Sequence, residues 1–81
     1  MEQRGGATDW TVEELATWLS SSLGLVDIAQ SFDAAGVDGG QLHEILLLEA
    51  NDCKEALVEL GASAVLDRTK IASRWKKIIR L

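Results

Sequence analysis

Residues 10–19 have the sequence WTVEELATWL, and this stretch defines both the start of a helix and its inward face. Thr11 and Glu14 form a Thr-x-x-Glu capping box, in which each side chain bonds the backbone N–H of the other residue. Apolar side chains then follow at the i, i+3, i+4 spacing of a helix with one buried face: Leu15, Trp18 and Leu19. The stretch therefore predicts an amphipathic helix that begins near Thr11.

The next segments also have helical spacing and are separated by glycines. Gly24 is a plausible end for the first helix, and a second helix is expected from about Leu25 to Ala35, where Gly36 ends it. Its apolar face contains Ile28, Ala29 and Phe32. Residues 37–40, Val-Asp-Gly-Gly, are typical of a turn.

A third helix is expected to begin near Gly40, and it contains four consecutive apolar residues at positions 45–48. Either this run is buried on several sides, or part of it is exposed for a partner. Asn51 is a suitable cap for a fourth helix, and Gly61 is a suitable stop. The fourth helix presents an i, i+3, i+4, i+7 stripe of Cys53, Ala56, Leu57 and Leu60.

The last helix is the clearest one. Ser63 is a suitable N-cap, and about 15 residues follow to the C-terminus, with one face made of Ile71, Trp75 and Ile78. The chain has no proline and no alternating strand pattern, so the sequence predicts an all-α fold. Residues 1–9 are polar and are expected to be a flexible lead-in, and residues 10–81 form one helical domain.

Several of these motifs, in this order, resemble the sterile alpha motif (SAM) domain family. Residues 10–19 look like the family's Trp-x-x-x-x-Val-x-x-Trp-Leu entrance, and residues 37–39, Val-Asp-Gly, match its Ile-Asp-Gly turn. The Leu60-Gly61 pair, followed by Arg68, Lys70 and Ile71, is similar to the start of the family's last helix. The resemblance implies a compact five-helix bundle with a longer C-terminal helix.

The chain departs from the family pattern in two places. It is several residues longer from Asp38 to Gly61, so the third and fourth helices are expected to be extended. Near the start of the last helix, the family's usual glycine and histidine are replaced by Leu66 and Asp67. Both replacements lie where the family makes contacts, so they bear on the choice of partner.

The charged residues are distributed unevenly along the 81-residue chain. Residues 1–63 contain twelve acidic and two basic residues, a net charge of −10, whereas residues 64–81 contain one acidic and six basic residues, a net charge of +5. Cations in the last turn of a helix suit the helix dipole, which accounts for the final three basic residues. It does not account for Arg68 and Lys70, which lie near the start of the last helix.

At 100° per residue, Leu66 lies roughly 140° from Ile71 around the last helix, on its outer face. A leucine surrounded by basic residues is typical of an interface anchor with a charged rim. We therefore expect a last-helix surface made of Leu66, Arg68, Thr69, Lys70 and Arg74.

The acidic residues of the middle segment are candidates for a second surface. Most surface carboxylates only face solvent, but the basic last helix gives a negative surface something to bind. The expected acidic mid surface comprises Asp33, Asp38, Glu44, Glu49, Asp52 and Glu55. The resemblance implies that the last helix of one copy docks on the middle of the next copy, which gives a homo-oligomer or a helical polymer.

Other interaction modes stay open at this stage. The partner can be a different SAM domain, and a death-fold adaptor is also helical and charge-complementary, although it usually has six helices and a longer chain. RNA binding through the basic last helix occurs in some family members. Here the −10 charge of residues 1–63 disfavours it, as does the lack of exposed aromatics between clustered cations.

The sequence contains no recognisable enzyme motif. It has no phosphate-binding glycine loop and no His-Glu-x-x-His, and it has one histidine, His43, expected at the surface or between helices. Cys53 cannot form an internal disulfide and is expected to be a buried thiol. We expect no catalysis, cofactor, metal, small-molecule substrate, nucleic acid or membrane contact. The lack of an apolar span or signal-peptide core suggests a cytoplasmic or nuclear location.

Overall fold

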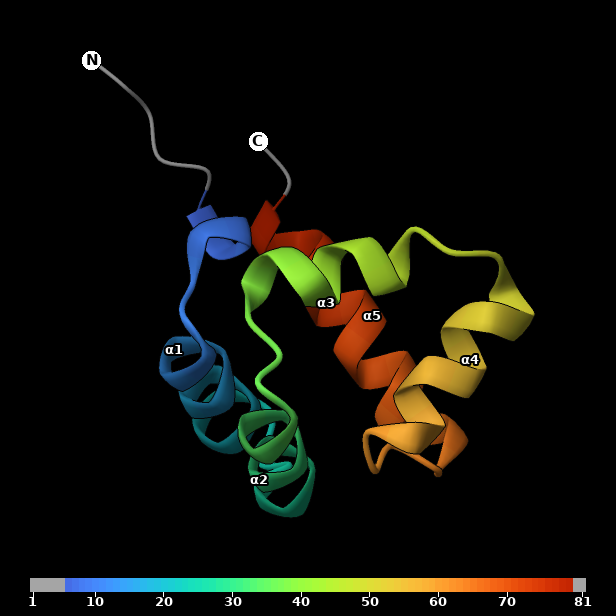
Figure 1. Ribbon diagram of the computed structural model, residues 1–81, viewed down its shortest axis with the longest axis horizontal. Coiled ribbons are helices and arrows are strands. Elements are labelled where there is room, and N and C mark those ends of the chain that lie inside the picture. Colours follow the sequence, from blue (N-terminus) through green and yellow to red (C-terminus); the bar gives the residue numbers. More distant parts are fainter. Residues whose placement is uncertain (1–5, 80–81) are drawn as a thin grey trace.

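A computed structural model describes residues 6–79, and in this part of the chain every regular element is a helix (Figure 1). The elements are, in chain order, the 3-10 turn η1 (Gly6–Asp9), α1 (Val12–Thr17), the π-helical turn η2 (Trp18–Ser22), α2 (Val26–Ala35), α3 (Gly39–Leu46), α4 (Ala50–Glu59) and α5 (Val65–Ile79). The prediction of an all-α five-helix bundle is confirmed. The last helix is the longest, with 15 residues.

The ends of the first helices are fixed by local hydrogen bonds. The predicted capping box is present, since Glu14 N donates to Thr11 Oγ1 at 3.2 Å and Thr11 N donates to Glu14 Oε1 at 2.9 Å. A second box, not recognised in the sequence, caps α3: Gln41 N donates to Asp38 Oδ1 at 2.9 Å. The predicted stops Gly24, Gly36 and Gly61 all have positive φ, which favours glycine because it lacks a Cβ.

Two predicted helix caps are wrong. Asn51 lies inside α4, and Glu49 occupies the N-cap position instead. Ser63 is not the N-cap of α5, because the helix begins at Val65, two residues later. Within the predicted lead-in, residues 6–9 form η1, which contributes the buried side chain of Ala7 to the core, and residues 1–5 lie outside the described residues.

The α3–α4 region resolves the question of the four apolar residues at 45–48. α3 has eight residues and ends at Leu46, so the next two leucines lie in the connection to α4. Ile45 and Leu46 pack against the core, whereas Leu47 is 72% exposed and Leu48 is 47% exposed. Part of the run is therefore exposed, as in the second of the two alternatives, and its use by a partner stays a prediction.

Three indole rings form the centre of the core. The ring centroids of Trp10, Trp18 and Trp75 lie between 5.6 and 6.0 Å apart, at the tilted and edge-on angles that aromatic pairs prefer. Trp75 is 1% exposed, and its Nε1–H donates to Nδ1 of His43 at 3.2 Å. His43 thus makes the expected contact between helices. Cys53, predicted to be buried, is only partly buried against the same core.

The buried face of α5 ends one residue away from the expected position. Ile71 and Trp75 are buried as predicted, but Ile78 is 40% exposed and Ile79 packs against the core instead. The stripe therefore continues at intervals of four residues. The angular position of a residue on a helix therefore does not guarantee its burial.

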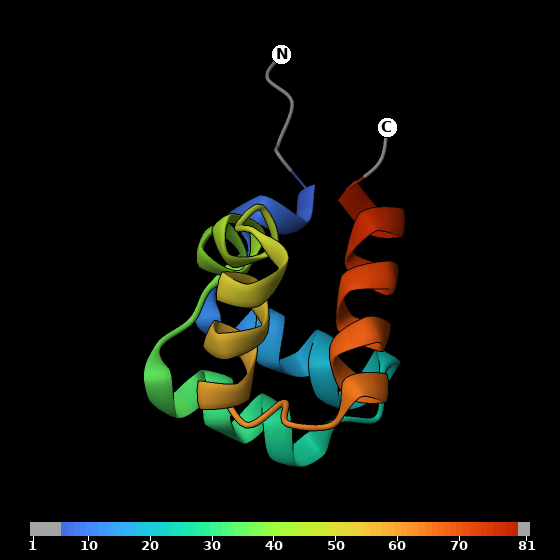
Figure 2. The ribbon, with the colours of Figure 1, turned by 90° about the vertical axis from the view of Figure 1, so that its right-hand side faces the viewer.

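The helices are arranged around this core so that α5 stands apart from α3 and α4. Figure 2 shows α5 along one side of the molecule and α3 with α4 along the other, with α2 across the base and α1 above it. In Figure 1, α1 and α4 lie at opposite ends of the long axis, along which the molecule extends 40 Å. The first turn of α5 and the α3–α4 face consequently point in different directions.

We expect Trp75→Ala to reduce the free energy of unfolding by about 3–5 kcal/mol, because it removes a large buried side chain from the indole cluster. Urea denaturation followed by circular dichroism measures this change. Ile78→Ala on the same helix is the control and should cost far less, since Ile78 is 40% exposed. Equal losses for the two variants would contradict the burial described for α5.

Gly39 has a role that the neighbouring Gly40 does not share. A Cβ at Gly39 would overlap the carbonyl oxygen of Ala7, because η1 and α3 meet there and Gly39 N donates to Trp10 O at 3.0 Å. A Cβ at Gly40 would meet its nearest atom, the Thr8 carbonyl oxygen, at an ordinary 3.5 Å.

We therefore expect Gly39→Ala to destabilise the domain by about 1–3 kcal/mol or more, through overpacking against the backbone. Gly40→Ala should be neutral or stabilising by up to about 1 kcal/mol, because alanine favours the helix. Thermal denaturation of the two variants side by side tests the difference. A Gly39→Ala variant as stable as Gly40→Ala would show that η1 does not pack on α3 as described.

Candidate protein interface

The first turn of α5 exposes two consecutive apolar side chains. Leu66 is 80% exposed, in agreement with its predicted place on the outer face, and Val65 beside it is 65% exposed. Thr69 and Lys70 are exposed on the following turn. We call Val65 and Leu66 the α5 tip. The sequence analysis selected Leu66 but not Val65.

The cations near the α5 tip differ in the hydrogen bonds that they already make within the domain. The guanidinium of Arg68 donates from Nη1 to the carbonyl oxygens of Ala62 at 3.0 Å and Ser63 at 2.7 Å, so it secures the α4–α5 connection. Lys70 Nζ donates to Leu23 O at 3.4 Å, a long bond from an exposed side chain. Arg74 is exposed one turn further along. Lys70 and Arg74 are therefore the cations best placed to meet a partner.

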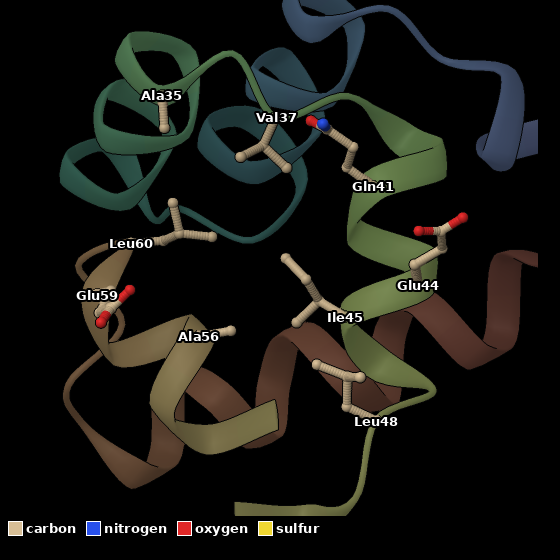
Figure 3. Close-up of a pocket in the computed structure, with 9 residues that line it drawn as sticks. All are labelled: Ala35, Val37, Gln41, Glu44, Ile45, Leu48, Ala56, Glu59 and Leu60. Carbon is tan, nitrogen blue, oxygen red and sulfur yellow. The ribbon is translucent and has the colours of Figure 1, made fainter. Parts of the chain in front are cut away.

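A groove of about 540 Å³ lies between the end of α2, α3 and α4 (Figure 3). Its apolar side chains converge from three separate segments: Val37, Ile45, Leu48, Ala56 and Leu60. Glu44 and Glu59 lie at its two sides, and both are exposed. We call this site the mid groove. It combines an apolar floor with an acidic rim.

The six residues of the predicted acidic mid surface lie in several separate places. Glu44 lines the mid groove, and Asp52 and Glu55 are exposed on α4. Asp33 lies in a separate depression between α1 and α2.

The other two residues of that predicted surface lie at the N-cap positions of helices. Asp38 caps α3 through its carboxylate, and Glu49 occupies the N-cap position of α4. Glu59, which the sequence analysis did not select, lines the groove that Glu44 lines. Its position in the last turn of α4 gives no signal by itself, since the groove exists only once three segments have come together.

Other kinds of site are not evident in the described part of the chain. Within residues 6–79, no group of three or more His, Cys, Asp or Glu side chains is arranged to hold a metal ion. Nor is there, along those residues, a helix with the length and apolar character needed to cross a membrane.

The fold and the two apolar surfaces are those of a small helical interaction domain. The sequence profile of the SAM domain (sterile alpha motif) family matches residues 9–79, so the chain belongs to that family. Domains of this family are protein-interaction modules rather than enzymes. Searches of curated proteins and of solved structures found no match.

Proposed function

We propose that this SAM domain associates head to tail with further copies of itself, the α5 tip of one copy entering the mid groove of the next. The carrying observation is an 80% exposed leucine at the start of α5 in a molecule that also has an apolar groove with an acidic rim. The α5 tip offers exposed apolar side chains, and the mid groove offers an apolar floor with carboxylates at its rim. The proposal also accounts for the exposed Leu48, which lines the groove.

The dimensions of the two surfaces support this pairing. A groove of about 540 Å³ lies within the range of sites that enclose small ligands, and it is large enough for the side chains of both Val65 and Leu66. Burying these side chains removes apolar area from water, which stabilises the contact by about 25 cal/mol per Å² before the cost of association.

Charge supports the same orientation. Lys70 follows the α5 tip by one turn, so it would approach Glu44 and Glu59 when the tip enters the groove. Opposite charges at the edge of an apolar contact accelerate association and select the correct partner more than they add affinity. Two identical tips or two identical grooves would instead bring like charges together.

The directions of the surfaces determine the kind of assembly. Because α5 and the α3–α4 face lie on different sides of the molecule, one copy can use both surfaces at once (Figure 2). A contact between two different patches closes into a ring only if the rotation between successive copies returns to the first copy. Otherwise the assembly grows into an open filament. A different SAM domain with an equivalent tip or groove would use the same surfaces.

We expect Leu66→Glu to abolish association and leave the monomer folded, because it places a charge in an apolar contact while altering a side chain that is 80% exposed. Sedimentation velocity over a range of concentrations measures the assembly, and circular dichroism checks the fold. Val26→Glu is the matched control, since Val26 is also exposed, at 52%, but lies on α2 outside the mid groove. A parent chain that is monomeric at every concentration would contradict self-association.

The matching variant on the other side is Glu44→Lys, which places a cation opposite Lys70 of the incoming copy. It should also block growth. A mixture of Leu66→Glu and Glu44→Lys retains one intact tip and one intact groove, so it should stop at a heterodimer. Two folded variants that fail to pair would show that the tip and the groove are not each other's partners.

The proposed contact should weaken with salt. Raising the ionic strength from about 0.05 to 0.5 M shortens the Debye length and screens the exposed charges, so the apparent size of the assembly should fall. Light scattering at fixed protein concentration follows this change. An assembly that grows with salt would show that its contact is apolar and independent of Lys70 and Glu44.

A further inference from the structure

A third surface lies on α1, away from both the α5 tip and the mid groove. It is a groove of about 470 Å³ lined by Trp10, Glu13, Glu14, Thr17, Trp18, Ser21 and Ser22. It shares no residue with the mid groove, and in Figure 1 α1 lies at the opposite end of the long axis from α4. We call it the α1 groove. Head-to-tail association leaves it uncovered.

The indole N–H of Trp18 indicates that the α1 groove accepts a polar partner. Trp18 is 9% exposed, so its ring is about nine-tenths buried. Among the described residues, no hydrogen bond engages this N–H, although every fully buried side-chain nitrogen or oxygen has a partner. The N–H must therefore reach the surface, and Trp18 is one of the residues that line the α1 groove. By contrast, the N–H of Trp75 is bonded to His43.

The charge of the α1 groove is entirely negative. Glu13 is exposed, and Glu14 uses Oε1 in the capping box, which leaves its second oxygen available. Residues 6–53 contain no lysine or arginine, and from α5 the Nζ of Lys70 reaches Leu23 O, one residue beyond Ser22. Trp10 is only partly buried, so part of its ring lies open beside them.

An arginine side chain matches this combination better than any other natural one. Its planar guanidinium stacks on an indole face and donates two parallel hydrogen bonds to a carboxylate, which a lysine ammonium does not do. The backbone carbonyl next to such a residue would accept the Trp18 N–H. The hydroxyls of Ser21 and Ser22 would bond the rest of an extended backbone.

We propose that the α1 groove binds an extended, arginine-containing peptide segment of a partner protein, with the guanidinium between Trp10 and Glu13. The site is independent of the head-to-tail contact, because the two use different residues and different faces. An assembled filament of this domain would then display one such groove on every copy.

The test uses the 15N-labelled full chain at about 0.05 M ionic strength, where surface charges are least screened. The probe is the capped peptide acetyl-Gly-Ala-Arg-Ala-Gly-amide, and the control is the same peptide with neutral citrulline in place of arginine. NMR resolves the three indole N–H signals separately. We expect saturable shifts of the Trp10 and Trp18 signals with the arginine peptide and none of the Trp75 signal, and we expect citrulline to bind at least fivefold more weakly.

Matched variants test the charge. Glu13→Gln should weaken binding about two- to fivefold, as expected for one exposed ion pair, whereas Asp27→Asn, an exposed carboxylate on α2 outside the α1 groove, should leave it unchanged. The proposal is overturned by any of three results. These are no shift up to about 5 mM peptide, where even a millimolar Kd would be evident, equal binding of the citrulline peptide, or equal loss in the two variants.

Discussion

The indole N–H of Trp75 can be buried only because His43 accepts its hydrogen bond, and the position of α5 depends on this pair. An unpaired N–H in that place would cost about 1–3 kcal/mol, a large part of the stability of an 81-residue domain. The same indole meets Trp10 and Trp18, so one side chain near the C-terminus joins α3 to the N-terminal helices. With α5 held at its second half, its first turn is left to project from the domain.

Sequence patterns predicted the parts of the fold that depend on neighbouring residues. The Thr11–Glu14 box and the glycine stops are local, and both are present. Asp38 was less predictable, because an aspartate suits a cap and an acidic surface equally well, and only the bond from Gln41 N distinguishes the two. The π-helical turn η2 (Trp18–Ser22) lies within a pattern that has the ordinary helical period, so nothing in the spacing indicates it.

The candidate interface also has a part that the sequence predicted and a part that it did not. The exposure of Leu66 follows from the helical phase of α5, a local property, and was predicted. The mid groove needs three segments to converge, so its members Val37 and Glu59 gave no signal in the sequence. Arg68 was placed with the docking cations because its charge is evident in the sequence. Its bonds to two loop carbonyls follow from the path of the α4–α5 connection, which the sequence does not specify.

The uneven distribution of charge has a physical consequence for assembly that neither surface explains alone. If the α5 tip docks in the mid groove of a neighbour, the positive charge of Lys70 lies against the acidic rim of that groove, and these opposite charges partly neutralise each other. Residues 6–53 contain no lysine or arginine, so the carboxylates of the α1 groove take no part in that neutralisation. An assembly built this way would concentrate negative charge along the α1 face, and a basic segment would meet that face more strongly on a filament than on a monomer, since several grooves act together. Growth of the filament and capture of a basic partner would therefore reinforce each other without sharing a residue.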